Sequence, residues 1–260
     1  MDTTNQTALI TGAGNGIGRA IAIAMGENKR NVVCADIDLD SAQITANTIR
    51  QLGVEATAVR VDVGETLQIS EMIQEVKEEF GRLDILVNNA GVTRAADIME
   101  LTEVDWDRIH RVNAKGVFFC LQGAAKHMIE QNSGGRIINI ASIAGRGFAG
   151  TSNAAYSASK GAVISLTKTA AQQLAKHDIT VNSICPGVTT TEIVEGLVKT
   201  RAEAKGISLD DMVKEMTDNI PLKRANDPED IAAMAIFLAS KGARNITWQS
   251  YNVDGGLVTS

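Results

Sequence analysis

Short apolar runs rich in β-branched residues alternate with longer helical patterns along this chain, and this alternation constrains its fold more than any other feature. A parallel sheet built from β-α-β units is buried on both faces, so its strands are continuous apolar runs. The alternation therefore predicts an α/β fold with a doubly wound, seven-stranded parallel sheet and helices on both faces. The predicted strands are Thr7–Ile10, Asn31–Ala35, Ala56–Val61, Leu83–Val87, Arg136–Ile140, Thr180–Ile184 and Gln249–Val253. The predicted helices begin near Ile17, Leu39, Thr66, Glu103, Ala155 and Asp230.

The alternation runs without a linker, so residues 1–260 are expected to form a single domain. Aromatic residues make up only 3% of the chain, and a core of Val, Ile, Leu and Ala suits a sheet between helices. The exception is the segment 189–224, which is charged and mostly helical. It follows the carboxyl end of the sixth predicted strand, where open α/β sheets bind ligands, so we expect it to be a lid over the site.

Composition excludes several classes of function. A net charge of -6 and a pI near 5.2 argue against nucleic acid as a partner. The polar first residues lack a signal-peptide pattern, and no apolar run reaches the length of a membrane span. Cys34, Cys120 and Cys185 are odd in number and widely separated, which indicates neither disulfides nor a metal site. We therefore expect a cytoplasmic protein without a metal.

A glycine-rich segment follows the first predicted strand and opens the first helix. It reads Thr11-Gly12-Ala13-Gly14-Asn15-Gly16-Ile17-Gly18. Glycines at positions 12, 16 and 18 allow a tight turn, close approach of a pyrophosphate to backbone N–H groups, and close packing of the helix on the strand. The amino terminus of the helix adds free N–H donors and a favourable dipole. This placement predicts a dinucleotide site.

The end of the second predicted strand indicates which dinucleotide binds. Asp36 lies at the separation from the glycine loop where an acid accepts hydrogen bonds from the adenosine ribose. A carboxylate there repels a 2′-phosphate, and neither Asn15 nor the residues just after Asp36 supply a cation. The sequence therefore predicts NAD. Asp38 and Asp40 are interpreted as solvated or helix-capping residues.

A tyrosine and a lysine stand four positions apart where a long helix is predicted to begin. Tyr156 and Lys160 then lie on the same helix face and can point into one site. A nearby cation stabilises a phenolate, and oxidised nicotinamide adds a second positive charge, so both lower the pKa of the tyrosine. Ser142 lies just past the fifth predicted strand, and Asn113 falls within the helix that follows Asn88-Asn89-Ala90-Gly91.

From the glycine loop to Val253-Asp254-Gly255-Gly256, these ordered motifs resemble the short-chain dehydrogenase/reductase family. The resemblance covers essentially the whole chain and implies a Rossmann-type fold. It implies that Tyr156 is the general acid or base, that Ser142 orients the substrate oxygen, that Lys160 holds the nicotinamide ribose, and that Asn113 anchors a water in a proton path. The implied cofactor-binding residues are Gly12, Asn15, Gly16, Ile17, Gly18, Asp36, Asp62, Val63, Asn89, Tyr156, Lys160, Pro186, Gly187, Thr189 and Thr191.

Two positions depart from the family pattern. Thr189 stands where Ile or Val is more usual, and Trp248 stands where a Gly commonly precedes the glutamine of the last strand. The contact expected at Thr189 is largely through backbone. Trp248 is interpreted as filling a subunit contact or a gap in the core, and catalysis should survive either departure.

The resemblance implies an NAD-dependent oxidoreductase that transfers hydride reversibly between a secondary alcohol and a carbonyl. The lid segment and the ending Gln249–Gly256 resemble those of polyol and butanediol dehydrogenases, which favours a polyol or sugar-derived substrate. The alternatives are reduction of a 3-oxoacyl thioester and a noncatalytic nucleotide-binding sensor. Family members are commonly tetramers, so a homo-oligomer is implied.

Other residues invite different interpretations. His110, His127 and His177 could indicate a serine hydrolase, but no Gly-x-Ser-x-Gly motif accompanies them. Arg146 lies four residues after Ser142, on a loop expected to border the reacting carbon. It either faces solvent, together with the lid cations Lys199, Arg201 and Lys205, or binds an anionic group of the substrate through its planar fork.

Overall fold

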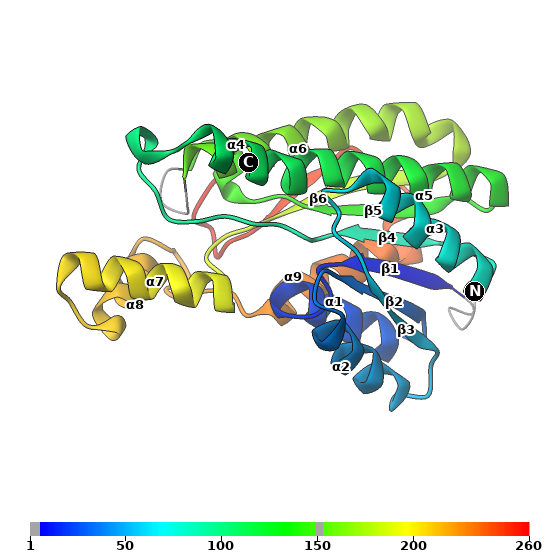
Figure 1. Ribbon diagram of the computed structural model, residues 1–260, viewed down its shortest axis with the longest axis horizontal. Coiled ribbons are helices and arrows are strands. Elements are labelled where there is room, and N and C mark those ends of the chain that lie inside the picture. Colours follow the sequence, from blue (N-terminus) through cyan, green and yellow to red (C-terminus); the bar gives the residue numbers. More distant parts are fainter. Residues whose placement is uncertain (1–5, 149–152, 260) are drawn as a thin grey trace.

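The computed structural model describes residues 6–148 and 153–259 (Figure 1). Its strands are β1 (Thr7–Thr11), β2 (Asn31–Asp36), β3 (Ala56–Arg60), β4 (Ile85–Asn88), β5 (Gly135–Ile140), β6 (Ile179–Pro186) and β7 (Ser250–Val253). Its α-helices are α1 (Gly16–Glu27), α2 (Leu39–Arg50), α3 (Thr66–Phe80), α4 (Glu103–His110), α5 (Val117–Gln131), α6 (Ala154–Leu174), α7 (Glu192–Lys205), α8 (Leu209–Asp218) and α9 (Pro228–Ala239).

Five shorter helical segments of the described chain complete the elements. Four are 3₁₀ turns: η1 (Ile98–Glu100), η3 (Ile143–Arg146), η4 (Ala175–His177) and η5 (Lys241–Ala243). The fifth, η2 (Arg111–Gly116), is a π-helix that joins α4 to α5. π-Helical turns are rare and are frequent at functional sites, so η2 marks a segment of interest.

The strands of the described chain form one seven-stranded sheet in the order β3-β2-β1-β4-β5-β6-β7. Every neighbouring pair is parallel. The order reverses direction between β1 and β4, and ligands bind at such a switch point in open α/β sheets. The predicted fold class is confirmed.

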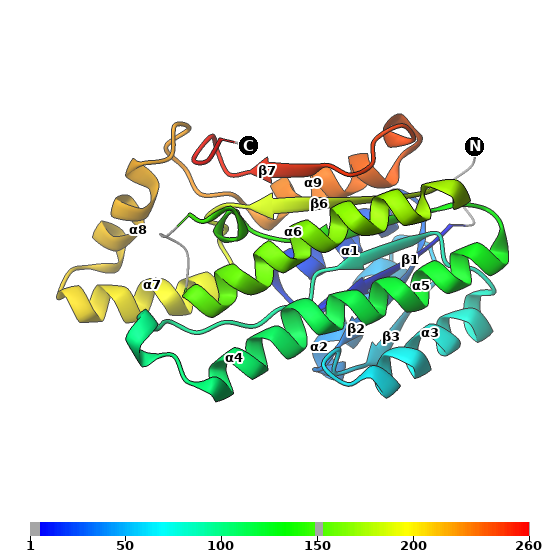
Figure 2. The same ribbon diagram turned by 90° about the horizontal axis from the view of Figure 1, so that it is seen from above.

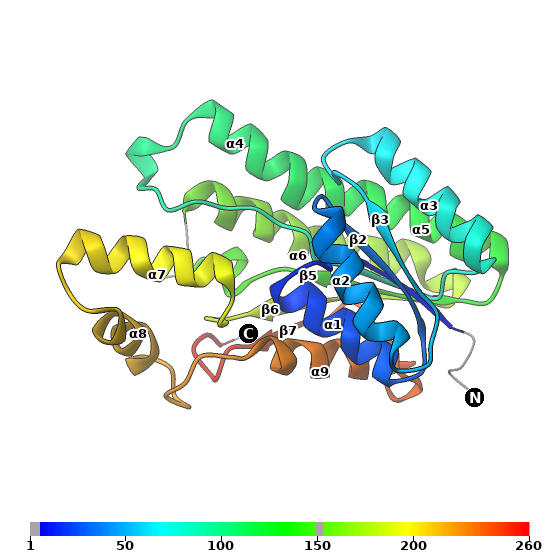
Figure 3. The same cartoon turned by 60° about the horizontal axis from the view of Figure 1, so that its bottom comes forward.

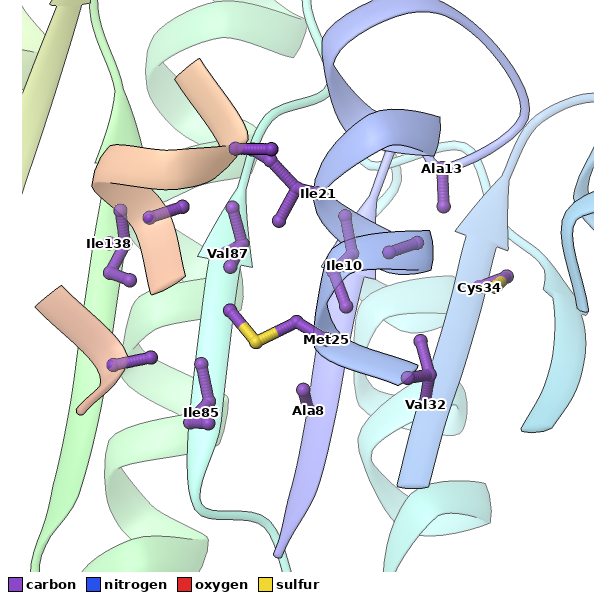
Figure 4. Close-up of a cluster of buried hydrophobic side chains, with 14 of the residues drawn as sticks. Ala8, Ile10, Ala13, Ile21, Met25, Val32, Cys34, Ile85, Val87 and Ile138 are labelled. Atoms are coloured by element: carbon purple, nitrogen blue, oxygen red, sulfur yellow. The ribbon is translucent and has the colours of Figure 1, made fainter. Parts of the chain in front are cut away.

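Both faces of the sheet are buried, which explains the continuous apolar runs. On β1, Ile10 packs against α1, α2 and α9, whereas Leu9 packs against α3, α5 and α6. Successive side chains of a strand point to opposite faces, so a strand covered on both sides is apolar at most of its positions. Figure 4 shows the first of these cores, with Ile21 and Met25 of α1 over the side chains of β1, β2 and β4.

Helices α7 and α8 stand apart from the two helical layers, beside the carboxyl ends of the strands (Figures 1 and 3). They are amphipathic and bury their apolar faces against each other. Val198, Ala202 and Met212 form a small separate core. Each helix begins at a hydroxyl N-cap, with Thr191 accepting from the N–H of Val194 and Ser208 from that of Asp211. The segment expected to be a lid is therefore a helical hairpin with its own packing.

Three details differ from the sequence prediction or extend it. β4 begins at Ile85 rather than at Leu83, and the predicted helix beginning at Glu103 is interrupted by the π-helix η2. Trp248 is half exposed, so it does not fill a gap in the core. Its φ of 69° lies in the left-handed region that favours glycine, which gives a physical reason for a glycine at this position.

Across the described ranges, no helix has both the length and the apolar character that crossing a bilayer requires.

Candidate active site

A pocket of about 420 Å³ lies at the carboxyl ends of the strands and is lined in part by the first residues of α7. Strands β6 and β7 point toward the side of the molecule where α7 and α8 lie (Figure 2). Loops that follow β1 to β6 all contribute to its wall, as the topology requires. The pocket brings together most of the residues predicted from the sequence. Those that line it are Gly12, Asn15, Gly16, Ile17, Asp36, Asp62, Val63, Asn89, Ser142, Tyr156, Lys160, Pro186, Gly187, Thr189 and Thr191.

The glycine loop is held in a conformation that only small residues permit. Gly12 and Gly16 have φ values of 67° and 53°, in the left-handed region. The side-chain amide of Asn89 donates to the carbonyl of Gly12 at 3.1 Å and so fixes the loop to the end of β4. This arrangement leaves the amino terminus of α1 at the pocket, where it can bind a phosphate.

Gly18 does not line the pocket, and its contact with a cofactor stays a prediction. A Cβ atom at this position would lie 2.0 Å from the carbonyl oxygen of Gly12 and 2.4 Å from Nδ2 of Asn89. Gly18 therefore acts through packing, because its missing side chain lets α1 approach the loop.

Asp36 ends β2 with its carboxylate at the pocket wall. Its Oδ2 accepts a hydrogen bond from the N–H of Gly14 at 2.8 Å, and its Oδ1 accepts one from the N–H of Asp38 at 3.1 Å. Each oxygen keeps capacity for a further donor. Asp38 caps α2 by accepting from Asp40 and Ser41, which confirms its interpretation as a capping residue.

Ser142 and Tyr156 meet at the opposite end of the pocket from Asp36, on η3 and α6. Asn153 caps α6 and accepts a hydrogen bond from the N–H of Tyr156 at 2.8 Å, so the first turn of the helix is held directly. Burial raises the pKa of the Tyr156 phenol, and a hydrogen bond with the Ser142 side chain lowers it by a smaller amount. The hydroxyls of Ser142 and Tyr156 therefore lie within hydrogen-bonding distance of each other.

Lys160 lies one turn further along α6 and is almost completely buried. Its ammonium donates to the carbonyl of Ile140 at 2.8 Å and lies 5.7 Å from the centre of the Tyr156 ring. Burial lowers the pKa of Lys160 to about 8, an effect that the charge of Cys185 partly opposes. In the protein alone, burial has the largest effect on the pKa of both Tyr156 and Lys160. The pKa of Tyr156 is raised by burial, whereas the sequence led us to expect that Lys160 would lower it.

Asn113 lies in the π-helix η2, fully buried behind the pocket wall. Its amide both accepts from the N–H of Val92 at 2.8 Å and donates to the carbonyl of Val92 at 2.9 Å. A side chain at Gly91 would lie 3.4 Å from Oδ1 of Asn113 and 3.5 Å from Nζ of Lys160. Asn113 and Lys160 thus both lie close to Gly91, although Asn113 itself does not line the pocket.

The start of the segment 189–224 forms part of the pocket wall. Thr189 forms a parallel bridge with Asn226, and the side-chain amide of Asn226 donates to the carbonyl of Val253 at 2.7 Å. Thr191 lies against the glycine loop, because a side chain at Gly16 would be 3.3 Å from its methyl group. Both ends of the segment 189–224 are therefore anchored beside the sheet.

The structure contradicts both interpretations of Arg146. Its guanidinium donates to the carbonyl of Ser250 in β7 at 2.6 Å, and Arg146 does not line the pocket. The side chain is partly buried beside Cys185. Arg146 therefore joins η3 to the edge strand and cannot bind a substrate anion from this position. Among the lid cations, Lys205 pairs with Glu215.

The three histidines lie away from the pocket. His110 stacks on Trp106, His127 is buried within α5, and His177 ends η4. Residues 6–148 and 153–259 contain no group of three acidic, histidine or cysteine side chains placed to hold a metal ion. All three cysteines are free and buried.

Sequence reasoning missed several residues of the pocket wall. They are Ile37, Val61, Val92, Thr93, Val112, Ile140, Ala141, Glu192 and Val194. Ile37, Val61 and Ala141 are adjacent to a predicted site residue at a strand end, and that position was the available signal. Val112 directly precedes the predicted Asn113, but it lies in the π-helix and not at a strand end.

Comparison with known proteins agrees with this geometry. A family model described as enoyl-(acyl carrier protein) reductase matches residues 12–258. The 3-oxoacyl-[acyl-carrier-protein] reductase FabG of Staphylococcus epidermidis is 41% identical over 97% of this chain and 99% of its own length. Galactitol 2-dehydrogenase of Agrobacterium fabrum is also 41% identical, over 98% of each chain.

Two solved structures extend the likeness to three dimensions. NAD+-bound xylitol dehydrogenase superposes with a TM-score of 0.92 at 31% identity, covering 98% of this chain and 100% of that one. A protein from Agrobacterium tumefaciens, provisionally named 2-deoxy-D-gluconate 3-dehydrogenase, has bound NADP; it superposes with a TM-score of 0.84 at 36% identity, covering 97% and 96%. The chain belongs to the short-chain dehydrogenase/reductase family. It is an oxidoreductase of a family that acts on CH–OH or carbonyl groups and uses a nicotinamide cofactor.

Proposed function

We propose that this protein is an NAD-dependent dehydrogenase that oxidises a secondary hydroxyl of a polyol or sugar-derived substrate and catalyses the reverse reduction. The observation that carries the proposal is the convergence of Ser142, Tyr156 and Lys160 at one end of a pocket whose other end presents Asp36. This arrangement supports the proposal, because a dinucleotide bound with its adenosine ribose at Asp36 would extend toward the phenol of Tyr156.

Each catalytic side chain has a defined task in the proposed reaction. NAD, when bound, supplies the hydride acceptor and a positive charge. The Ser142 hydroxyl holds the substrate oxygen, and Oη of Tyr156 removes the proton from the substrate hydroxyl during oxidation. The ammonium of Lys160 favours the phenolate and binds the ribose, and Asn113 anchors a water that passes protons from Lys160 to solvent. Because burial alone raises the pKa of Tyr156, these positive charges are needed to bring it into the working range.

The preference for NAD rests on Asp36. Its carboxylate is fixed at the pocket wall by two backbone N–H groups, so it cannot turn away from a 2′-phosphate without losing both bonds. Lys160 is the one cation among the described residues that line the pocket, and it lies at the opposite end. Arg60 lies outside the wall, with its Nε 3.5 Å from the carbonyl of Ile37. Solved relatives bind NAD+ in one case and NADP in another, so the proposed choice of NAD depends on Asp36.

The preference for a polyol rests on the polarity of the catalytic end. Thr93, Ser142, Thr191 and Glu192 offer hydroxyl and carboxylate groups that can bind the hydroxyls of a substrate. A galactitol dehydrogenase and a xylitol dehydrogenase stand among the relatives. The second candidate is reduction of a 3-oxoacyl thioester, which the equal identity to FabG favours. A noncatalytic sensor is the weakest alternative, because the catalytic side chains are all in place.

Three broader features belong to the same proposal. The segment 189–224 acts as a lid on a single domain, supported by Thr191, Glu192 and Val194 in the pocket wall. The protein assembles as a homotetramer, supported by exposed apolar side chains on α4 and α5, such as Trp106 and Phe118. It works in the cytoplasm, supported by its three free, buried cysteines.

The test is an NADH absorbance assay on the purified protein. Galactitol, sorbitol and xylitol are offered with NAD or NADP, and a 3-oxoacyl thioester is offered with NADH or NADPH. We expect kcat/KM to be highest for a polyol with NAD. Preference for the thioester with NADPH would replace the proposal with its second candidate, and no turnover with any pair would favour the sensor.

Tyr156→Phe tests the catalytic assignment. It removes the exchangeable proton and keeps the ring, so kcat should fall by at least about 10²-fold, as is typical when a general acid or base is lost. NAD affinity should change little. Tyr251→Phe, the same chemical change in β7, is the matched control and should keep its turnover. A Tyr156→Phe variant with most of its kcat would remove this residue from the mechanism.

A further inference from the structure

Arg111, the first residue of the π-helix η2, reaches across to the loop that follows β3. Its Nη2 lies 3.0 Å from Oδ2 of Asp62, and its Nη1 lies 2.6 Å from Oε1 of Glu65. Between these two acids the guanidinium lies against the backbone, because a Cβ on Gly64 would be 2.5 Å from Nη1 of Arg111. The guanidinium of Arg111 therefore contacts the loop at Asp62, Gly64 and Glu65.

The π-helix meets the same loop at two further points. The ammonium of Lys115 donates to the carbonyl of Gly64 at 3.3 Å. A side chain on Gly116 would lie 2.7 Å from the carbonyl oxygen of Val63, so the two backbones are in close contact there. Residues 62–65 of this loop thus all contact the π-helix η2.

This loop forms the pocket wall at the end away from Tyr156. Asp62 and Val63 both line the pocket, beside the carboxyl end of β2 that carries Asp36. Oδ1 of Asp62 accepts from the N–H of Gly64 at 2.8 Å, so the carboxylate is held from both sides, by the loop and by Arg111. In the proposed cofactor orientation, this is the wall that the adenine meets.

The ion pairs themselves add little to folding, because Arg111 and Glu65 are substantially exposed. Their geometric effect is larger. A guanidinium offers donors in a rigid fork and can hold two carboxylates at once, which an ammonium cannot do in the same arrangement. Affinity for a ligand rises when the residues that bind it are already held in the bound conformation.

We infer that Arg111 is a positioning residue for cofactor affinity, which holds Asp62 and Val63 in place for the adenine. The inference rests on the proposed cofactor orientation and adds to it a residue outside the pocket. Arg111 touches neither the pocket nor the catalytic side chains. Its loss should therefore weaken binding of the adenosine half of the cofactor and leave the chemical step largely intact.

The experiment compares wild type with Arg111→Met and Arg111→Lys. Dissociation constants for NAD and AMP are measured by calorimetry, and KM for NAD and kcat are measured over a range of pH. For Arg111→Met we expect both dissociation constants and KM to rise by about tenfold, the size of one lost charge-assisted contact. The kcat at saturating NAD and its pH profile should keep their wild-type form. Arg111→Lys should give an intermediate affinity, because it restores the charge and not the fork.

Arg108→Met is the matched control, since Arg108 is an exposed arginine one turn earlier on α4, and it should bind NAD and AMP as wild type does. Wild-type affinity for AMP in Arg111→Met overturns the inference while leaving the proposed function intact. So does a fall in kcat, or a changed pH profile, at unchanged KM, since Arg111 would then act through Asn113. If wild type binds neither NAD nor AMP, the cofactor proposal fails, and this inference fails with it. Should Arg111→Met not fold, the same comparisons apply to Arg111→Lys.

Discussion

Replacing Lys160 by methionine should make the protein more stable and inactive. Lys160 is 3% exposed, and burial lowers its pKa from the ordinary 10.5 to about 8. One pKa unit corresponds to 1.36 kcal/mol, so keeping this ammonium charged inside the protein costs about 3 kcal/mol below pH 8. Methionine has a similar length and no charge to desolvate. Lys160→Met should therefore gain up to about 3 kcal/mol in the free energy of unfolding at pH 7.

The pH dependence of the gain identifies its cause. Between pH 8 and 10.5 the unfolded chain holds a proton on Lys160 that the native protein has released, so wild-type stability rises with pH in this window. The advantage of Lys160→Met should shrink across it and disappear above 10.5. Other groups that titrate there are shared by both proteins and cancel in the difference.

The assay is urea unfolding of both proteins at several pH values from 6 to 9.5. Lys168→Met is the control: the same change at an exposed position of α6 should alter stability by no more than about 0.5 kcal/mol at any pH. A Lys160→Met variant that is less stable than wild type at pH 7 would refute the reasoning. A stability gain that does not vary with pH would show that relief of buried charge is not its source.

Three further predictions follow from single contacts. Gly18→Ala should weaken NAD binding measured by calorimetry, because its Cβ would lie 2.0 Å from the Gly12 carbonyl; unchanged affinity would contradict the packing role. Asn153→Ala should lose about 0.5–2 kcal/mol of unfolding free energy and also turnover, since the cap holds Tyr156. Asn153→Asp keeps the cap but loses the hydrogen bond that Nδ2 donates to the Arg94 carbonyl at 2.7 Å, so it should recover only part of both. Burial lowers the pKa of His127, so below about pH 6.5 the unfolded chain binds a proton there before the folded protein does, and the melting temperature of wild type should fall. His127→Leu should show a smaller fall. Equal melting curves of wild type at pH 5 and 7 would disprove this.

The positions of the strands were predictable because most of the strands are covered on both faces. Such strands are mainly apolar, and their apolar runs stand out between helical patterns, as residues 32–35 show. Buried polar residues such as Asn182 and Ser183 in β6 are the exceptions, and their side chains are hydrogen-bonded. The glycine loop and Asp36 were predictable for a related reason. Their chemistry depends on backbone geometry at a strand end, and strand ends can be located from the apolar pattern.

The π-helix could not be predicted, since its segment Arg111–Gly116 carries ordinary helix-forming residues. Its extra residue per turn is stabilised by contacts with distant parts of the chain, such as Val92 and Gly64. Arg146 was misplaced for a similar reason. Sequence spacing put it near Ser142, whereas its direction depends on Ser250, which is 104 positions away and pairs through the sheet edge.

The separate core of α7 and α8 has a consequence for how substrate choice can change. Val198, Ala202 and Met212 pack within the hairpin and not into the sheet, while both ends of the segment are tied beside β7 through Asn226. A related hairpin with matching end residues could therefore replace this segment without repacking the two main cores. With the proposed lid role, exchanges of this kind, or point mutations inside the hairpin, would change the substrate while leaving the cofactor site and the two main cores unchanged.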